Sequence, residues 1–220
     1  LLLIWDIPYY IIPVIALICN IIVVSSNSFN YVRAGNYNLK LLTPFLIGSI
    51  PLSFIGGTLI IKKEIFEILL FIVLLIAGLL LLINNKSYKN EIIIIKKINV
   101  FFSFFIGSIL GLISGIVGIG GGIFLSPMLY LLKLEKPKVI ATTASLFILI
   151  NSISGILGQF TKELIINEIL SYWLFFICVF VGGLIGNYLN IKIFSNRILA
   201  IITSLLVIFV AIRVGYKIFF

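Results

Sequence analysis

The amino-acid sequence predicts an all-α fold, a polytopic transmembrane helical bundle of about seven or eight membrane segments with one glycine-broken or re-entrant segment. Hydrophobic residues make up 62% of the 220 residues and charged residues only 10%, against roughly 25% charged residues in ordinary globular domains. The charges cluster between seven long charge-free stretches. Because no long hydrophilic segment interrupts them, residues 1–220 are expected to form a single integral membrane domain.

Each charge-free stretch is a candidate membrane segment, since a helix needs about 20 apolar residues to cross a bilayer. Six of the seven approach or exceed that length, and the last becomes long enough if Arg213 extends its charged group to the interface. Residues 98–132 are too many for one crossing and barely enough for two. The stretches are 7–32, 41–61, 68–85, 98–132, 139–161, 169–191 and 198–212.

The composition also excludes several functional classes. The net charge of +9 comes from cations in short loops between spans, which are better interpreted as topology signals facing anionic lipid than as a nucleic-acid surface. The chain has no histidine, so imidazole-based metal sites and catalysis are excluded. No metal or other cofactor is therefore expected, and Cys19 and Cys178 are most simply inert thiols, because neither belongs to a Cys-x-x-Cys pair.

An internal repeat relates the two halves of the chain. The polar segments 25–28 and 151–154 and the Gly-Gly pairs 56–57 and 182–183 are separated by one common offset of 126 residues. At this offset, the counterpart of the glycine-rich segment near Gly120 would precede Leu1, so the first repeat is expected to lack its first glycine-rich helix. The predicted divisions are a first repeat at 1–83, a connecting loop at 84–99 and a second repeat at 100–220.

The distribution of cations predicts how the repeats are oriented. If residues 98–132 cross once and re-enter, the 16 cations divide 9 to 7 between the two sides, whereas two crossings place 11 on one side and 5 on the other. The positive-inside rule favours two crossings, which makes the repeats inverted. Inverted repeats with a binding site near the midplane are a recurrent transporter architecture.

The glycines of residues 98–132 fall into two groups. Gly107, Gly111 and Gly115 recur every four residues, a spacing typical of close helix packing in lipid. The segment 118–122 instead favours a helix break, since three of its four glycines are adjacent and each costs about 1 kcal/mol of helix propensity relative to alanine. Ser126 is expected to cap a half-helix over 127–132, and a helix that starts inside the membrane offers free N–H groups to an anion.

Polar side chains cluster on the two repeat-related helices. Residues 139–161 contain Thr142, Thr143, Ser145, Asn151, Ser152, Ser154 and Gln159, and the first repeat contains Asn20, Ser25, Ser26, Asn27, Ser28 and Asn30. Some of these groups are expected to bond helices to each other. No carboxylate is expected mid-membrane, so the clusters predict a neutral, donor-rich cavity that suits an anion. The candidate substrate-binding residues are Gly118, Gly120, Gly121, Gly122, Ser126, Thr142, Ser145, Asn151, Ser152, Ser25 and Ser26.

The motifs themselves resemble a known family. The segments 118–122, 127–129, 141–146 and 151–155, together with Arg33-Ala34-Gly35-Asn36 after the first polar helix, are similar to the TauE/SafE sulfite exporter family. The resemblance implies a multi-pass plasma-membrane permease that exports sulfite, organosulfonates or related small anions. Its partners would be the anionic substrate and the lipid bilayer, with no nucleic acid, and a homo-oligomer is compatible with it.

Two other functional classes are open on the sequence alone. A membrane thiol redox carrier would use Cys19 and Cys178, but the repeat offset pairs these cysteines with Ser145 and Leu52, so they are not equivalent. A non-transporting membrane scaffold would have no solute flux that depends on the polar clusters.

Overall fold

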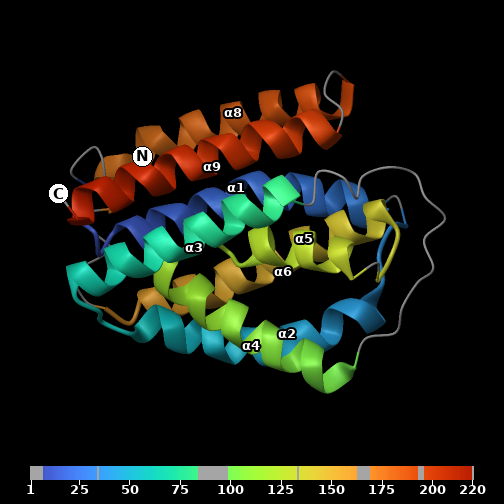
Figure 1. Ribbon diagram of the computed structural model, residues 1–220, viewed down its shortest axis with the longest axis horizontal. Helices are drawn as coiled ribbons and strands as arrows, with labels where there is room; N and C mark the ends of the chain where they lie inside the picture. The colour runs from blue at the N-terminus through green and yellow to red at the C-terminus, as the bar shows by residue number, and fades with distance from the viewer. Residues whose placement is uncertain are drawn as a thin grey trace.

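The computed structural model is all-helical over the residues that it describes, namely 7–33, 35–83, 99–132, 134–162, 169–192 and 196–219. A short 3₁₀ turn, η3 (Leu170–Tyr172), precedes α8 (Figure 1). The α-helices are α1 (Ile12–Arg33), α2 (Leu39–Thr58), α3 (Lys63–Ile83), α4 (Val100–Val117), α5 (Gly122–Leu131), α6 (Pro137–Gln159), α8 (Trp173–Lys192) and α9 (Asn196–Phe219).

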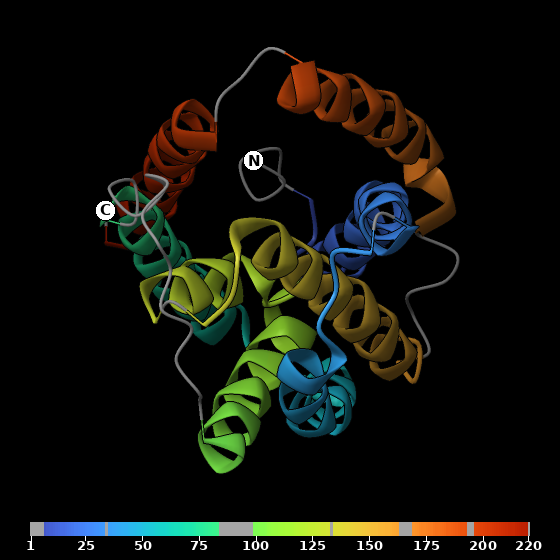
Figure 2. The same ribbon diagram turned by 90° about the vertical axis from the view of Figure 1, so that its right-hand side faces the viewer.

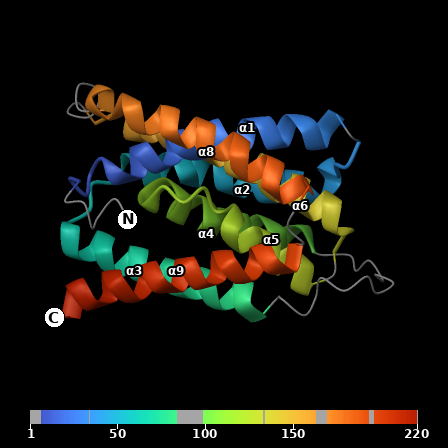
Figure 3. The same ribbon diagram turned by 90° about the horizontal axis from the view of Figure 1, so that it is seen from above.

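These helices confirm the predicted transmembrane bundle. Six of those in the described residues, α1, α2, α3, α4, α6 and α9, are long and apolar enough to cross a membrane. Two apolar helices are shorter, α5 and the Trp173–Gly186 part of α8. Successive helices run in alternating directions along the bundle (Figures 1 and 3), so the connections lie at its two ends. The described residues thus contain six long and two shorter apolar helices, in line with the seven or eight membrane segments that the sequence predicts. The assignment of the shortest segment differs: α9 is a long span, although residues 198–212 are the shortest charge-free stretch, and the apolar part of α8 is the shorter helix.

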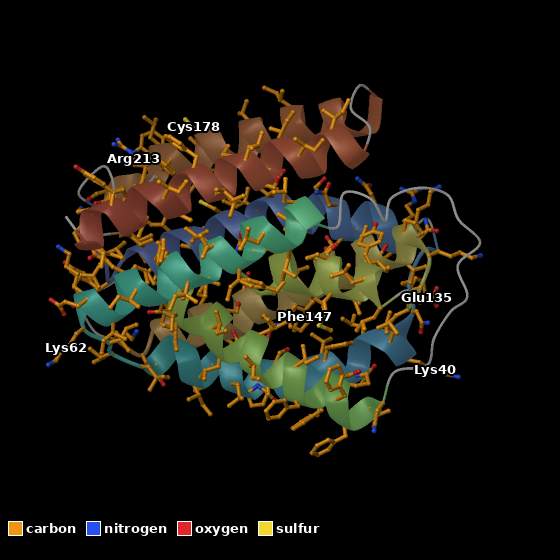
Figure 4. The ribbon with its side chains drawn as sticks, viewed as in Figure 1. Lys40, Lys62, Glu135, Phe147, Cys178 and Arg213 are labelled. Carbon is orange, nitrogen blue, oxygen red and sulfur yellow. The ribbon has the colours of Figure 1, made fainter. Side chains whose placement is uncertain are left out.

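The two ends of the bundle carry different sets of cations. Lys40 lies at the end where α2 begins and α5 ends, beside Glu135, whereas Lys62 and Arg213 lie toward the opposite end (Figure 4). Helix α4 is long enough to cross a membrane, but α5 has only 10 residues, so the prediction that residues 98–132 cross twice is wrong. Because α5 returns toward the end from which α4 starts, both ends of this segment still lie at the same end of the bundle, as the 11-to-5 division of cations requires. Lys86, Lys89, Lys96, Lys97 and Lys133, which contribute to that division, lie outside the described residues.

Helix α2 packs closely against α4 and α6. A methyl group on Gly107 of α4 would lie 2.2 Å from the carbonyl oxygen of Phe45, and one on Gly158 of α6 would lie 2.2 Å from that of Phe54. The hydroxyl of Ser53 donates to the carbonyl oxygen of Asn151 at 2.8 Å. The glycines thus allow backbone-to-backbone packing, as the four-residue spacing predicts.

The repeat-related helices run in opposite directions. Helix α1 is antiparallel to α6, α2 to α8, and α3 to α9 (Figures 1 and 3), which is the relation that inverted topology requires. Viewed along the bundle, α8 and α9 lie on the periphery next to α1 and α3 (Figure 2). The division into repeats stays a prediction, and residues 84–98 of the connecting loop lie outside the described residues.

Candidate functional site

The glycine-rich segment breaks the helix between α4 and α5. Helix α4 ends at Val117, and Gly118 adopts a left-handed conformation with φ 83°. Gly120 and Gly121 also have positive φ values of 76° and 69°, a backbone region that L-residues with side chains rarely adopt. Gly121 packs next to Phe147, near the middle of the bundle (Figure 4). The break therefore lies deep in the bundle.

The start of the half-helix differs from the prediction. Helix α5 begins at Gly122, with Gly121 as its N-cap, so the expected start at Pro127 is wrong. Since Gly121 can take the left-handed conformation, the backbone can reverse and restart a helix at once. Pro127 is tolerated as the sixth residue of α5, and Ser126 lines a cavity instead of capping a helix.

The break leaves several backbone amides without acceptors. The Gly118 N–H donates to the carbonyl oxygen of Ser114 at 2.8 Å, and the Gly122 N–H to that of Gly120 at 2.9 Å. Four other backbone N–H groups of this segment donate to no acceptor within the described residues. They belong to Ile119, Gly120, Gly121 and Ile123. Free N–H groups at the start of a helix carry a partial positive charge.

A cavity of about 570 Å³ adjoins this break, between α1, α5 and α6. It is lined by Ala16, Asn20, Val24, Asn27, Gly118, Ile119, Gly122, Ile123, Ser126, Ala141, Ala144, Ser145 and Ile148. None of these side chains is charged, so the polar character comes from two amides, two hydroxyls and the backbone of the break. The carboxylates of Glu64 and Glu67 belong to the first turns of α3 and are not among the lining groups.

Helix α1 contributes two amide side chains that are missing from the predicted site. Asn20 and Asn27 line the cavity, and the Asn20 side-chain amide donates to the carbonyl oxygen of Gly118 at 3.1 Å. Asn20, Val24 and Asn27 have the four- and three-residue spacing of one helix face. The helical register therefore places the two asparagines on one face of α1, and the packing of the helices turns that face toward the break.

Four of the predicted residues line the cavity: Gly118, Gly122, Ser126 and Ser145. Gly120 lies directly behind them, since a methyl group there would be 3.0 Å from Asn20 Nδ2 and 3.3 Å from Ser152 Oγ. Gly121 faces the ring of Phe147 and the carbonyl oxygen of Leu110 instead. The hydroxyls of Ser145 and Ser28 lie 2.9 Å apart, which joins α6 to α1 beside the cavity.

The structure does not bring the other predicted side chains into the cavity lining. Thr142 is fully buried and donates to the carbonyl oxygen of Lys138, and Asn151 donates to that of Phe147. Ser25 and Ser26 are exposed on α1, with the Ser25 hydroxyl donating to the carbonyl oxygen of Ile21. They lie on a different face of α1 from Asn20 and Asn27, because adjacent residues of a helix point about 100° apart.

Three buried oxygen atoms near the break have no hydrogen-bond partner in the described part of the chain: Ser114 Oγ, Asn151 Oδ1 and Ser152 Oγ. Ser152 Oγ lies on the Gly120 side of α6. Buried polar groups without partners are costly in proteins. Ser152 therefore gives the environment of the break unused hydrogen-bonding capacity.

The two cysteines lie away from this site. Cys19 is partly buried on α1, Cys178 is exposed on α8, and both are free thiols. Neither lines the cavity.

Comparisons with known proteins agree with this architecture. The family model of the sulfite exporter TauE/SafE matches residues 1–214. The chain is 25% identical over 192 residues to the probable membrane transporter protein y4hK of Sinorhizobium fredii (strain NBRC 101917 / NGR234), an alignment that covers 87% of this chain and 77% of that protein. No solved structure matches the chain significantly.

Proposed function

The chain belongs to the sulfite exporter TauE/SafE family and is a membrane transporter, and from this premise we propose that it exports small anions, sulfite or organosulfonates, across the plasma membrane. The proposal rests on one observation, the group of free backbone amides at a helix break beside a cavity without charged side chains. An anion that enters would exchange part of its hydration for these N–H groups and for the positive end of the α5 dipole.

The lining favours an anion over a cation. A cation site inside a membrane protein is expected to present carboxylates or several free carbonyl oxygens. The cavity lining contains no carboxylate, and the carbonyl oxygen of Gly118, one of the lining residues, already accepts from Asn20. A fixed lysine or arginine would hold an anion tightly and slow its release. Neutral donors from Ser126, Ser145 and Asn27 suit binding that is followed by release.

The cavity extends from the break toward the Lys40 end of the bundle. The lining residues Asn27, Ser126 and Ala141 lie in the parts of α1, α5 and α6 that approach this end (Figure 1). Because cytoplasmic loops are rich in lysine and arginine, we assign the Lys40 end to the cytoplasm. The site would then lie toward the cytoplasmic side, from which export begins.

Replacing Ser126 by alanine is the direct test of this proposal. The substitution removes a cavity hydroxyl without adding bulk, and sulfite efflux from proteoliposomes is expected to fall about tenfold or more, since a hydrogen bond to a charged group is worth about 1.5–3 kcal/mol. Thr203→Val, on the exposed face of α9, also removes one hydroxyl, but away from the cavity, and should leave efflux unchanged. Equal efflux from both variants would rule the cavity out as the binding site.

A further inference from the structure

A second hollow of about 260 Å³ adjoins the cavity on the other side of the helix break. Its lining consists of aliphatic side chains from α1, α3, α9 and the segment at the end of α4, among them Leu74, Val117 and Val210. Ala16 and Ile119 line both spaces. The cavity with its amides and hydroxyls and the apolar hollow are therefore neighbours that share these two residues in their walls.

Helix α1 extends along both spaces with one face. Ile12 and Ala16 line the apolar hollow, whereas Ala16, Asn20 and Asn27 line the cavity. Ile12 and Asn20 are eight residues apart, so the two environments follow one another over about 12 Å of helix axis. A single elongated molecule could contact both.

The chemistry of the two spaces differs in a way that specifies such a molecule. An aliphatic hollow cannot replace the hydration of an anion, but it accommodates hydrocarbon well.

We propose that the site takes amphiphilic anions, with the sulfonate group at the glycine break and an unbranched hydrocarbon tail that passes Ile119 into the apolar hollow. This inference rests on the proposed function, because it uses the same anion site. It adds a selection by tail length that the cavity alone would not provide. An acyl chain of a membrane lipid is the competing occupant of the hollow.

The test measures how methanesulfonate, butanesulfonate and octanesulfonate compete with sulfite efflux from proteoliposomes. For the wild type, the inhibition constant should fall with tail length, by up to about fourfold for each methylene that becomes buried. Leu74→Phe and Val210→Phe fill the hollow from α3 and α9 and should remove most of this dependence while methanesulfonate still competes. Leu79→Phe makes the same change at an exposed position of α3 and should retain it.

The outcomes separate the two proposals. The tail site would be overturned if methanesulfonate competes with sulfite efflux but the inhibition constant does not change with tail length. It would also be overturned if Leu74→Phe and Val210→Phe both keep the wild-type dependence of the inhibition constant on tail length. A lipid that permanently fills the hollow would produce the first of these results. If the wild type transports neither sulfite nor any sulfonate, the proposed function fails and the tail site fails with it.

Discussion

Replacing Gly115 by alanine is expected to lower the thermal stability of the protein by several degrees. A methyl group on Gly115 would lie 2.1 Å from the carbonyl oxygen of Ser53 and 2.7 Å from the amide nitrogen of Gly57. Both are backbone atoms of α2, so a rotamer change cannot relieve the overlap and the two helices must separate. Overpacking of this kind costs about 1–3 kcal/mol, or roughly 3–10 °C in a chain of this length.

The separation would also disturb a hydrogen bond at the end of α6. The side-chain amide of Gln159 donates to the carbonyl oxygen of Gly115 at 2.9 Å, and Lys162 Nζ donates to Gln159 Oε1 at 2.9 Å. Gly186→Ala on α8 is the matched control, because no atom lies within 4 Å of the added methyl group. Thermal unfolding in detergent should show no loss for Gly186→Ala, and an equal effect of the two substitutions would contradict the packing argument.

The sequence predicted the fold well because its signals are local. Charge-free length predicts a membrane span wherever it occurs, and consecutive glycines predict a helix break without reference to the rest of the chain. The start of α5 was harder to predict, because Ser126-Pro127 satisfies the rules for a helix start but Gly121 makes an earlier start possible. Whether the helix starts at Gly122 or at Pro127 depends on tertiary packing, because Phe147 and Leu110 lie so close to Gly121 that only a residue without a side chain fits there.

The composition of the site was less predictable, because it depends on helix rotation. Ser25 and Ser26 belong to the polar cluster that contains Asn27, but they lie on an exposed face of α1. Asn20 lies five residues before this group, and contact with Gly118 on a distant segment of the chain brings it into the site. Such a contact can be known only after the helices are placed.

The packing of α2 bears on how alternating access would occur. The predicted inverted repeat favours a mechanism in which one repeat rocks against the other. In that predicted division α2 belongs to the first repeat and α6 to the second, and the two helices pack backbone to backbone: a methyl group on Gly57 would lie 2.4 Å from the carbonyl oxygen of Gly155. Rocking of the predicted repeats would therefore have to open this backbone packing.

Replacing Gly120 by alanine is expected to abolish most transport while the protein stays folded. The left-handed backbone at φ 76° costs a residue with a Cβ about 1–2 kcal/mol. The added methyl group would also lie 3.0 Å from Asn20 Nδ2 and 2.8 Å from Ile148 Cγ2. These are side-chain atoms that can move, so the main consequence is displacement of the Asn20 amide and partial obstruction of the free N–H groups. Sulfite efflux should fall about tenfold or more, as expected when a hydrogen bond to a charged ligand is lost.

Gly35→Ala separates the effect on transport from the backbone strain. Gly35 has φ 72°, almost the same as Gly120, but no atom lies within 4 Å of the added methyl group. Both variants should therefore lose a similar amount of thermal stability, and only Gly120→Ala should lose transport. If both keep wild-type efflux, the free amides of the break do not bind the anion. If both lose efflux equally, strain rather than obstruction of the site is responsible, because the only feature that the two positions share is the left-handed backbone.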